Sequence, residues 1–276
     1  MTIKIVTDST LTVEPELIEK YNITIVPLAI LIDGVQYSDS DLSAEQFMAQ
    51  MKNSKHLPKT SQPPVGVFAE TYDRLSADGS QIISIHLTKG LSGTVEAARQ
   101  GAMLSNADVT VIDSDFIDQA MKFQVIEAAK MAQNGATKDE IVAAINQTKK
   151  KTELYIGIST LENLVKGGRI GRVTGALSGL LNIKVVMTLV DTKLEPVLKG
   201  RGNKTFQKWL DDFSARLETC QVKEIGISHA ENIEFANQMK DTLQKFVSKT
   251  ISVMDTGSTV ATHTGSGAWS LMIEFE

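Results

Sequence analysis

Side chains that can donate hydrogen bonds gather in four short segments of the sequence. They are Thr7-Asp8-Ser9-Thr10, Thr60-Ser61-Gln62-Pro63, Leu91-Ser92-Gly93-Thr94 and Thr262-His263-Thr264-Gly265. Each segment is expected to follow a strand, at the edge of an α/β sheet where ligands bind, and to open a helix. Hydroxyl groups and the free N–H groups of a helix start are suited to an anion. The pattern therefore indicates an anion site made of neutral donors.

A helix cap is the competing interpretation for each of these segments. For Ser9 and Ser61 the cap is the simpler explanation, because both residues stand where a helix start is expected. The segment around Ser92 is harder to explain in that way. Gly90 and Gly93 let the backbone come close to a ligand, which a cap does not require.

A serine hydrolase is the alternative function. Ser92, Asp113 and His263 occur in the chain order Ser, Asp, His of the α/β-hydrolases. However, Thr94 stands where the Gly-x-Ser-x-Gly elbow needs its second glycine, and Leu-Ser-Gly-Thr resembles an unstrained helix start. We therefore prefer a binding function, with no catalytic residue.

Other chemistries find little support in the sequence. No Gly-Lys dipeptide occurs, so the chain has no Walker A loop, and Gly265-Ser266-Gly267 is followed by Ser270 where a dinucleotide fingerprint needs Gly or Ala. The four histidines have no partner at helical metal-ligand spacing. Asp113 and Asp115 are too few for a metal site, and Asp113 with Ser114 is expected to end a strand and cap a helix. We expect neither a metal nor a cofactor.

The composition is that of a globular protein. In 276 residues, 42% are hydrophobic, and 28 Lys and Arg oppose 33 Asp and Glu, giving a net charge of −5. This argues against a nucleic-acid partner. The longest apolar run, Ile23–Ile32, is too short to span a membrane, so contact with a membrane surface is expected to be transient at most. The lone Cys220 forms no disulfide framework, and we expect a cytoplasmic location.

Short runs rich in β-branched residues alternate with longer amphipathic ones, which is typical of an α/β fold. The first predicted strands are Ile3–Thr7, Ile23–Ile32, Gln81–His86 and Asp108–Asp113. The predicted helices among them are Pro15–Tyr21, Ser43–Lys52, Val65–Leu75, Thr94–Leu104 and Phe116–Asn134. Capping-box spacing marks helix starts after Ser43 and Thr137. Asp33-Gly34 predicts a hairpin, so the sheet is not expected to be purely parallel.

The second half repeats this theme with a hairpin at Asp191-Thr192-Lys193 between two strands. The other predicted strands are Glu153–Ile158, Lys223–Ser228, Ile251–Met254 and Trp269–Phe275, and the predicted helices are Lys204–Cys220 and Ile233–Phe246. The polar run Thr148–Lys151 marks a boundary. We therefore predict two α/β domains, 1–150 and 151–276, with mixed sheets flanked by helices and a ligand in the cleft between them.

The four hydroxyl-rich segments and the run from Leu161 to Ile170, Leu-Glu-Asn-Leu-Val-Lys-Gly-Gly-Arg-Ile, resemble the DegV family in order and spacing. The resemblance extends from about Ile3 to Trp269. It implies a two-domain protein that binds one long-chain fatty acid. It further implies the fatty-acid-binding subunit of a bacterial fatty acid kinase system, in which a separate kinase subunit phosphorylates the bound acid for phospholipid synthesis.

The resemblance also assigns roles to single residues. Thr60, Ser92 and His263 match the groups that hold the carboxylate, and Gly93 matches a backbone donor beside them. Residues placed around this set by their positions are Ser61, Thr94, Asp113 and Ser114. Arg169 matches a surface arginine of the family.

Cations in two loops suggest where a kinase subunit would dock. The residues are Lys166, Arg169, Arg172 and Arg201. The alternative explanation is that these charges lie on exposed loops and contact only water. The acyl tail needs an apolar tunnel. Its candidate walls are Phe116, Ile117, Met121, Phe123 and Ile126, or Leu161, Leu164, Ile170 and Leu177, each of which could equally be ordinary core.

Overall fold

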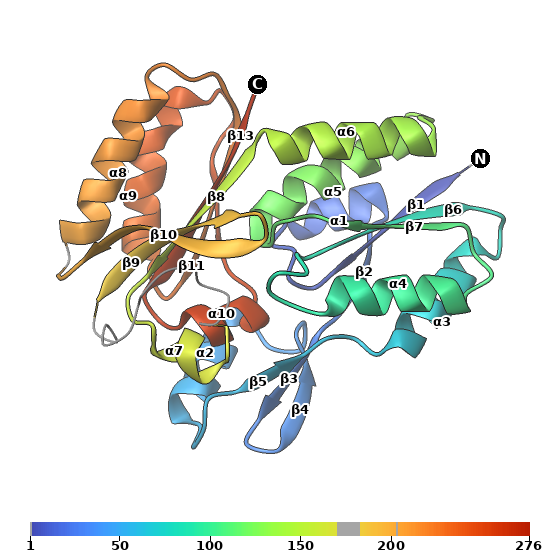
Figure 1. Ribbon diagram of the computed structural model, residues 1–276, viewed down its shortest axis with the longest axis horizontal. Helices are drawn as coiled ribbons and strands as arrows, with labels where there is room; N and C mark the ends of the chain where they lie inside the picture. Colours follow the sequence, from blue (N-terminus) through green and yellow to red (C-terminus); the bar gives the residue numbers. More distant parts are fainter. Residues whose placement is uncertain (1, 170–182, 203) are drawn as a thin grey trace.

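The first half of the chain forms a parallel sheet with helices on both faces (Figure 1). The computed structural model describes residues 2–169, 183–202 and 204–276. The strands are β1 (Ile3–Asp8), β2 (Thr24–Val26), β6 (Gln81–His86) and β7 (Val109–Asp113), in the order β2-β1-β6-β7. All three pairings are parallel, so the antiparallel component that we expected is not in this sheet.

Side chains along each strand point alternately to the two faces of the sheet, and each face packs against different helices. Ile3 and Ile5 of β1 pack in one apolar cluster with α5 (Asp118–Gln133), whereas Val6 packs in another with α3 (Val65–Ser76) and α4 (Thr94–Leu104). The helices of this half are α1 (Pro15–Tyr21), α2 (Ala44–Asn53), α3 (Val65–Ser76), α4 (Thr94–Leu104), α5 (Asp118–Gln133) and α6 (Lys138–Lys150). The capping boxes predicted at Ser43 and Thr137 are both present.

The predicted strand Ile23–Ile32 is wrong as a single element. Pro27, which has no N–H group, lies between β2 and β3 (Ala29–Ile32), and the two strands belong to different sheets. The Asp33-Gly34 turn joins β3 to β4 (Val35–Ser38), as predicted, with φ of 46° and 91° at its two residues. β5 (Lys59–Ser61), which we did not predict, completes an antiparallel sheet in the order β4-β3-β5.

The second half forms one mixed sheet of six strands. They are β8 (Thr152–Ile158), β9 (Lys184–Val190), β10 (Lys193–Gly200), β11 (Val222–Ala230), β12 (Ser252–Asp255) and β13 (Ala268–Phe275), in the order β10-β9-β8-β13-β11-β12. Among the described strands of this sheet, only the β11–β12 pairing is parallel. Its helices are α7 (Glu162–Lys166), α8 (Lys204–Leu217), α9 (Ile233–Leu243) and α10 (Ser258–Thr264), and a 3₁₀ turn spans Gln244–Phe246. The α/β class with mixed sheets is confirmed.

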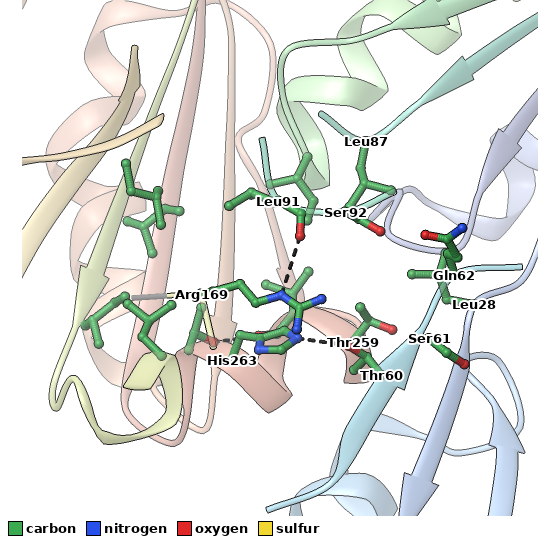
Figure 2. A pocket seen from close by; sticks show the side chains of 17 residues that line it. Leu28, Thr60, Ser61, Gln62, Leu87, Leu91, Ser92, Arg169, Thr259 and His263 are labelled. Carbon is green, nitrogen blue, oxygen red and sulfur yellow. Dashed lines mark hydrogen bonds between the residues drawn. The ribbon is translucent and has the colours of Figure 1, made fainter. Parts of the chain in front are cut away.

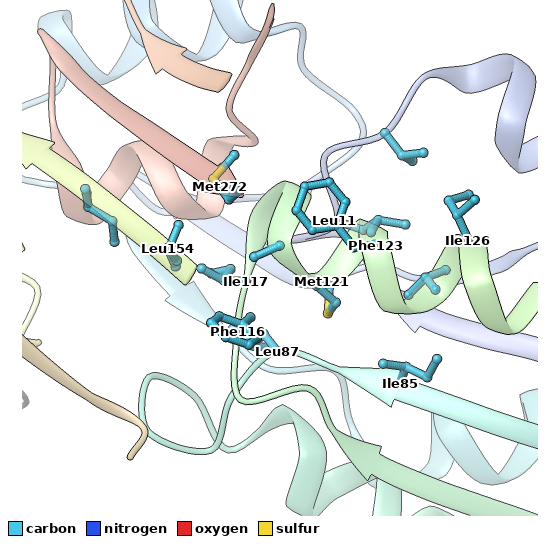
Figure 3. Packing of buried hydrophobic residues seen from close by; sticks show 14 of the residues in the cluster. Leu11, Ile85, Leu87, Phe116, Ile117, Met121, Phe123, Ile126, Leu154 and Met272 are labelled. Carbon is cyan, nitrogen blue, oxygen red and sulfur yellow. The ribbon is translucent and has the colours of Figure 1, made fainter. Parts of the chain in front are cut away.

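The two halves meet through α5. One face of the six-stranded sheet packs against α8 and α9, and its other face shares a large apolar cluster with α5 and β6 (Figures 1 and 3). Gln119, near the start of α5, donates from Nε2 to the Ile227 carbonyl of β11 at 2.8 Å. Its amide oxygen packs on Gly226, where an added Cβ would lie only 2.5 Å from it. The division into domains 1–150 and 151–276 stays a prediction.

Candidate functional site

An apolar pocket with a polar mouth lies where the two halves face each other (Figure 2). Its free space, including the open mouth, is about 660 Å³. The apolar walls are Leu28, Leu87, Leu91, Ile117, Ile156, Ile158, Leu164, Leu194 and Val260. The polar lining is Thr60, Ser61, Gln62, Ser92, Arg169, Thr259, His263 and Thr264. The pocket therefore brings together three of the predicted segments: those around Thr60, Ser92 and His263.

Thr60 and His263 are joined at the mouth although they are 203 positions apart. Thr60 Oγ1 lies 3.0 Å from His263 Nε2. Thr60 is the middle residue of β5, and its pairing with Ile30 of β3 turns it to the buried side of the small sheet. His263 lies in the last turn of α10. The prediction that its segment opens a helix was therefore wrong, because the helix ends there at Gly265.

The Gly167-Gly168-Arg169 run positions the histidine. A Cβ on Gly167 would lie 2.4 Å from His263 Nδ1, so the ring fits only against a glycine. Gly168 has φ of 73°, a conformation that glycine adopts without strain, and it turns the chain back toward the pocket. Arg169 then reaches across to the other half: its Nε donates to the Leu91 carbonyl at 3.5 Å, and Nη1 donates to the Gly167 carbonyl at 2.8 Å.

Burial keeps His263 neutral. Loss of solvent, with a smaller contribution from the positive charge of Arg169, lowers the pKa of His263 to about 4. Its Nδ1 is buried without a hydrogen-bond partner. A proton on Nε2 would be donated to Thr60 Oγ1, which leaves the Thr60 O–H group available to a ligand at the mouth. The pair can then act as one neutral donor.

The Ser92 segment provides a second group of donors from the other half. Gly93 is the N-cap of α4, and the first N–H groups of a helix have no partner within it. A Cβ on Gly93 would lie 2.1 Å from the Gln62 side chain, so this glycine allows the Thr60 segment to pack against α4. Gly90 lies against the hairpin turn at Thr192, where an added Cβ would be 1.8 Å from the Thr192 carbonyl oxygen. Contacts from both halves thus hold the loop.

The three residues of the hydrolase hypothesis do not form a triad. Ser92 Oγ lies 2.9 Å from the Thr94 hydroxyl, and His263 Nε2 contacts Thr60 instead. Asp113 accepts the backbone N–H groups of Lys89 and Asp115 at 3.3 and 3.0 Å. Its carboxylate therefore caps the loop after β7 and does not orient a histidine, so the hydrolase alternative is rejected.

The remaining predicted site residues have separate positions. Ser61 lines the mouth, and Thr94 supports Ser92 through its hydroxyl. Ser114 is buried, where its hydroxyl donates to the Phe116 carbonyl and accepts the Phe116 N–H, so it shapes the loop before α5. Asp113 and Ser114 thus have structural roles.

A buried carboxylate that the sequence analysis overlooked anchors α10. Asp39 accepts the Thr259 N–H in the first turn of α10 at 2.9 Å and the Ser9 hydroxyl at 2.9 Å. Burial raises the pKa of Asp39. Ser9 in turn accepts the Leu28 N–H. The first hydroxyl-rich segment therefore fixes the helix that carries His263, and it lies outside the pocket lining.

The predicted tunnel walls divide into two groups. Ile117 and Leu164 line the pocket. Five others lie in the apolar cluster to which these two residues also belong: Phe116, Met121, Phe123 and Ile126, which Figure 3 labels, and Leu161. Ile170 and Leu177 lie outside the described residues. Sequence reasoning missed Ile156 and Ile158, although the alternation along Glu153–Ile158 could have indicated an apolar face.

The cations predicted to form a docking surface differ in their exposure to solvent. Arg169 was expected at the surface, but it is half-buried in the pocket wall because the turn at Gly168 directs it to Leu91. Lys166 and Arg201 are exposed. Arg172 lies outside the described residues.

Within residues 2–169, 183–202 and 204–276, no group of three His, Cys, Asp or Glu side chains could hold a metal ion. In the same ranges, the helices are too short or too polar to cross a bilayer.

Fold and site together define a class: an α/β protein of two packed halves, with an apolar ligand pocket whose polar mouth receives residues from both. Comparison with known proteins identifies the family. The protein-family model described as "Uncharacterised protein, DegV family" matches residues 2–276, and the chain belongs to the DegV family.

Relatives and solved structures agree with this assignment. A DegV domain-containing protein of Lactococcus lactis, YejH, is 58% identical over 278 residues, covering 100% of both chains. The crystal structure of DegV, a fatty acid binding protein from Bacillus subtilis, has 27% identity and a TM-score of 0.90, with 100% of both chains covered. A Thermus thermophilus DegV family protein, described by its fatty acid binding, has 26% identity, a TM-score of 0.90 and the same coverage.

Proposed function

We propose that the protein binds a single long-chain fatty acid, with its carboxylate at the mouth of the pocket and its tail inside. The observation that carries this proposal is the division of the pocket into nine apolar wall residues and a mouth of hydroxyl, amide, imidazole and guanidinium groups. A fatty acid has the same division. The solved relatives described as fatty-acid-binding support this choice of ligand.

The tail would provide most of the affinity. Burial of a methylene contributes about 0.8 kcal/mol, so sixteen carbons could contribute roughly 12 kcal/mol as an upper figure. The head group then has mainly to be oriented, for which a few neutral donors suffice.

Four groups would hold the carboxylate. Thr60 and His263 act as the joined donor pair, with His263 neutral above its low pKa. Ser92 and the N–H group of Gly93 face them from the start of α4, where the helix dipole favours an anion. Arg169, whose charge lies in the wall, adds positive potential to the mouth.

We also propose a partner protein, a separate kinase subunit that acts on the bound acid. Carboxylate oxygens held at an open mouth by neutral donors keep their nucleophilicity, so a separate kinase subunit could transfer a phosphoryl group to them. The exposed residues Lys166 and Arg201 are the candidates for docking, and a cytoplasmic location fits such a shared substrate.

Titration with matched ligands tests the binding function. Delipidated protein should bind a long-chain fatty acid at least about tenfold more tightly than the alcohol of equal length, because hydrogen bonds to a charged carboxylate are stronger than those to a neutral hydroxyl. Equal affinities would contradict the carboxylate site. Turnover of a nitrophenyl ester would contradict the assignment as a binding protein.

The kinase role has a separate test. His263→Ala should reduce phosphorylation of the bound acid by a cognate kinase more than it reduces binding. Equal losses would make His263 an affinity residue only.

A further inference from the structure

A second, smaller cavity continues the pocket toward the inside of the protein. The empty space inside it, counted together with its opening, is about 300 Å³. The two cavities share the wall residues Ile117, Ile156, Val260 and Thr264. Leu154 lines only the inner cavity, and Ile158 only the outer one. Because side chains alternate along a strand, Ile158, Ile156 and Leu154 form one row on β8 that leads from the outer cavity to the inner one.

The inner cavity ends at a buried carboxylate. Asp118, at the start of α5, is 1% exposed and accepts hydroxyl groups of Ser228, Thr256 and Ser270 at 2.8, 3.1 and 3.2 Å. We call these four residues the Asp118 cluster. Ser228 and Ser270 are directly opposite each other on β11 and β13, so the cluster covers that side of the sheet. The β8 side, with Ile156 and Leu154, is apolar.

We propose that the acyl tail runs inward along the β8 row, that its methyl end stops beside Leu154, and that the Asp118 cluster limits the length of the chain. This inference rests on the proposed function. Methylenes gain affinity against Ile117 and Leu154, about fourfold for each one buried. A longer chain would have to displace hydroxyl donors from a buried carboxylate and leave it unsatisfied, which opposes binding.

A length profile tests the proposal. Affinities for a series of even-numbered saturated acids are measured for the parent protein, Leu154→Ala and Leu164→Ala. Leu154 lines only the inner cavity, whereas Leu164 lines only the outer one and is the matched control. We expect Leu154→Ala to move the upper length limit up by one step, with a gain of about fifteenfold in relative affinity for the next longer acid. Leu164→Ala should weaken all acids alike.

A second variant, expected to shift the chain-length limit in the opposite direction, keeps the proposal testable if Leu154→Ala misfolds. Ala268 lines only the inner cavity, and Ala268→Val should lower the length limit by one step. If Leu154→Ala does not fold, Leu154→Val replaces it, with a smaller shift in the same direction.

Two results would overturn the inference. One is a parent protein that binds acids while the inner-cavity variants keep its length profile; the other is an equal shift in Leu164→Ala. A parent that binds no acid of any length would instead remove the proposed function, and this inference with it.

Discussion

Gly167→Ala is expected to weaken binding of the acid without touching the ligand. The new Cβ would lie 2.4 Å from His263 Nδ1 and 2.9 Å from the Asn163 carbonyl oxygen. Both contacts are shorter than a real Cβ contact, so the imidazole must move and the chain at the end of α7 must also shift by a few tenths of an ångström. Movement of the imidazole breaks the 3.0 Å contact with Thr60 and leaves the Thr60 hydroxyl without orientation.

The magnitude follows from the lost contact. The variant loses one net hydrogen bond, and the bond from Thr60 to the charged ligand becomes weaker. Together these losses reduce the binding free energy by about 1–2 kcal/mol, which is about 5- to 30-fold in affinity. The backbone at Gly167 has φ of −77° and ψ of −4°, which alanine adopts without strain. The dihedral angles therefore allow alanine at this position.

The assay compares two ligands in two variants. Fatty acid and fatty alcohol of equal length are titrated into Gly167→Ala and into Gly66→Ala, whose Cβ meets no atom within 4 Å. Only Gly167→Ala should lose affinity, and the loss should be larger for the acid than for the alcohol. Unchanged acid binding would refute the positioning role of Gly167. An equal loss for acid and alcohol would show that the pocket wall had changed instead of the head-group site.

Three further predictions concern the mouth. Ser92→Ala and Thr60→Ala should each weaken acid binding by about tenfold or more without unfolding the protein, because each removes a hydrogen bond to a charged group; parent-like affinity for a fluorescent fatty acid in both would place the carboxylate elsewhere. His263 has a pKa of about 4 when folded and 6.5 as its ordinary value, so the unfolded chain takes up a proton that the folded chain refuses as the pH falls through this range. In urea titrations of lipid-free protein, this group should lower the free energy of unfolding by about 2 kcal/mol between pH 7 and pH 5. The His263→Gln variant should lack that part of the decrease. Arg169→Ala should weaken acid binding several-fold, because the Leu91 loop loses its tie; unchanged binding with a slower, salt-dependent kinase step would assign the arginine to docking.

Local chemistry made much of the fold predictable. The capping boxes at Ser43 and Thr137, the Asp33-Gly34 turn and the Asp191-Thr192 hairpin all depend on neighbouring residues, and the structure confirms them. β5 was missed because a three-residue strand has too few positions to show alternation. It exists through its pairing with β3, a contact between distant segments.

The site shows the same limit. The hydroxyl-rich segments indicated donors, but no local pattern could show that Thr60 meets His263 across 203 positions. The expected helix start at His263 failed because hydroxyl residues also occur in last turns, where Thr262 and Thr264 donate back to helix carbonyls. Gly167 could be explained only once the ring packed on it was visible.

Native mass spectrometry of the protein, purified without added lipid, tests the central claim most directly. It weighs any retained ligand with the folded chain. We predict one additional mass, equal to a single long-chain fatty acid, in a one-to-one ratio, and its loss in a Thr60→Ala, Ser92→Ala double variant. A parent protein that carries no fatty acid and gains none when incubated with one would contradict the account.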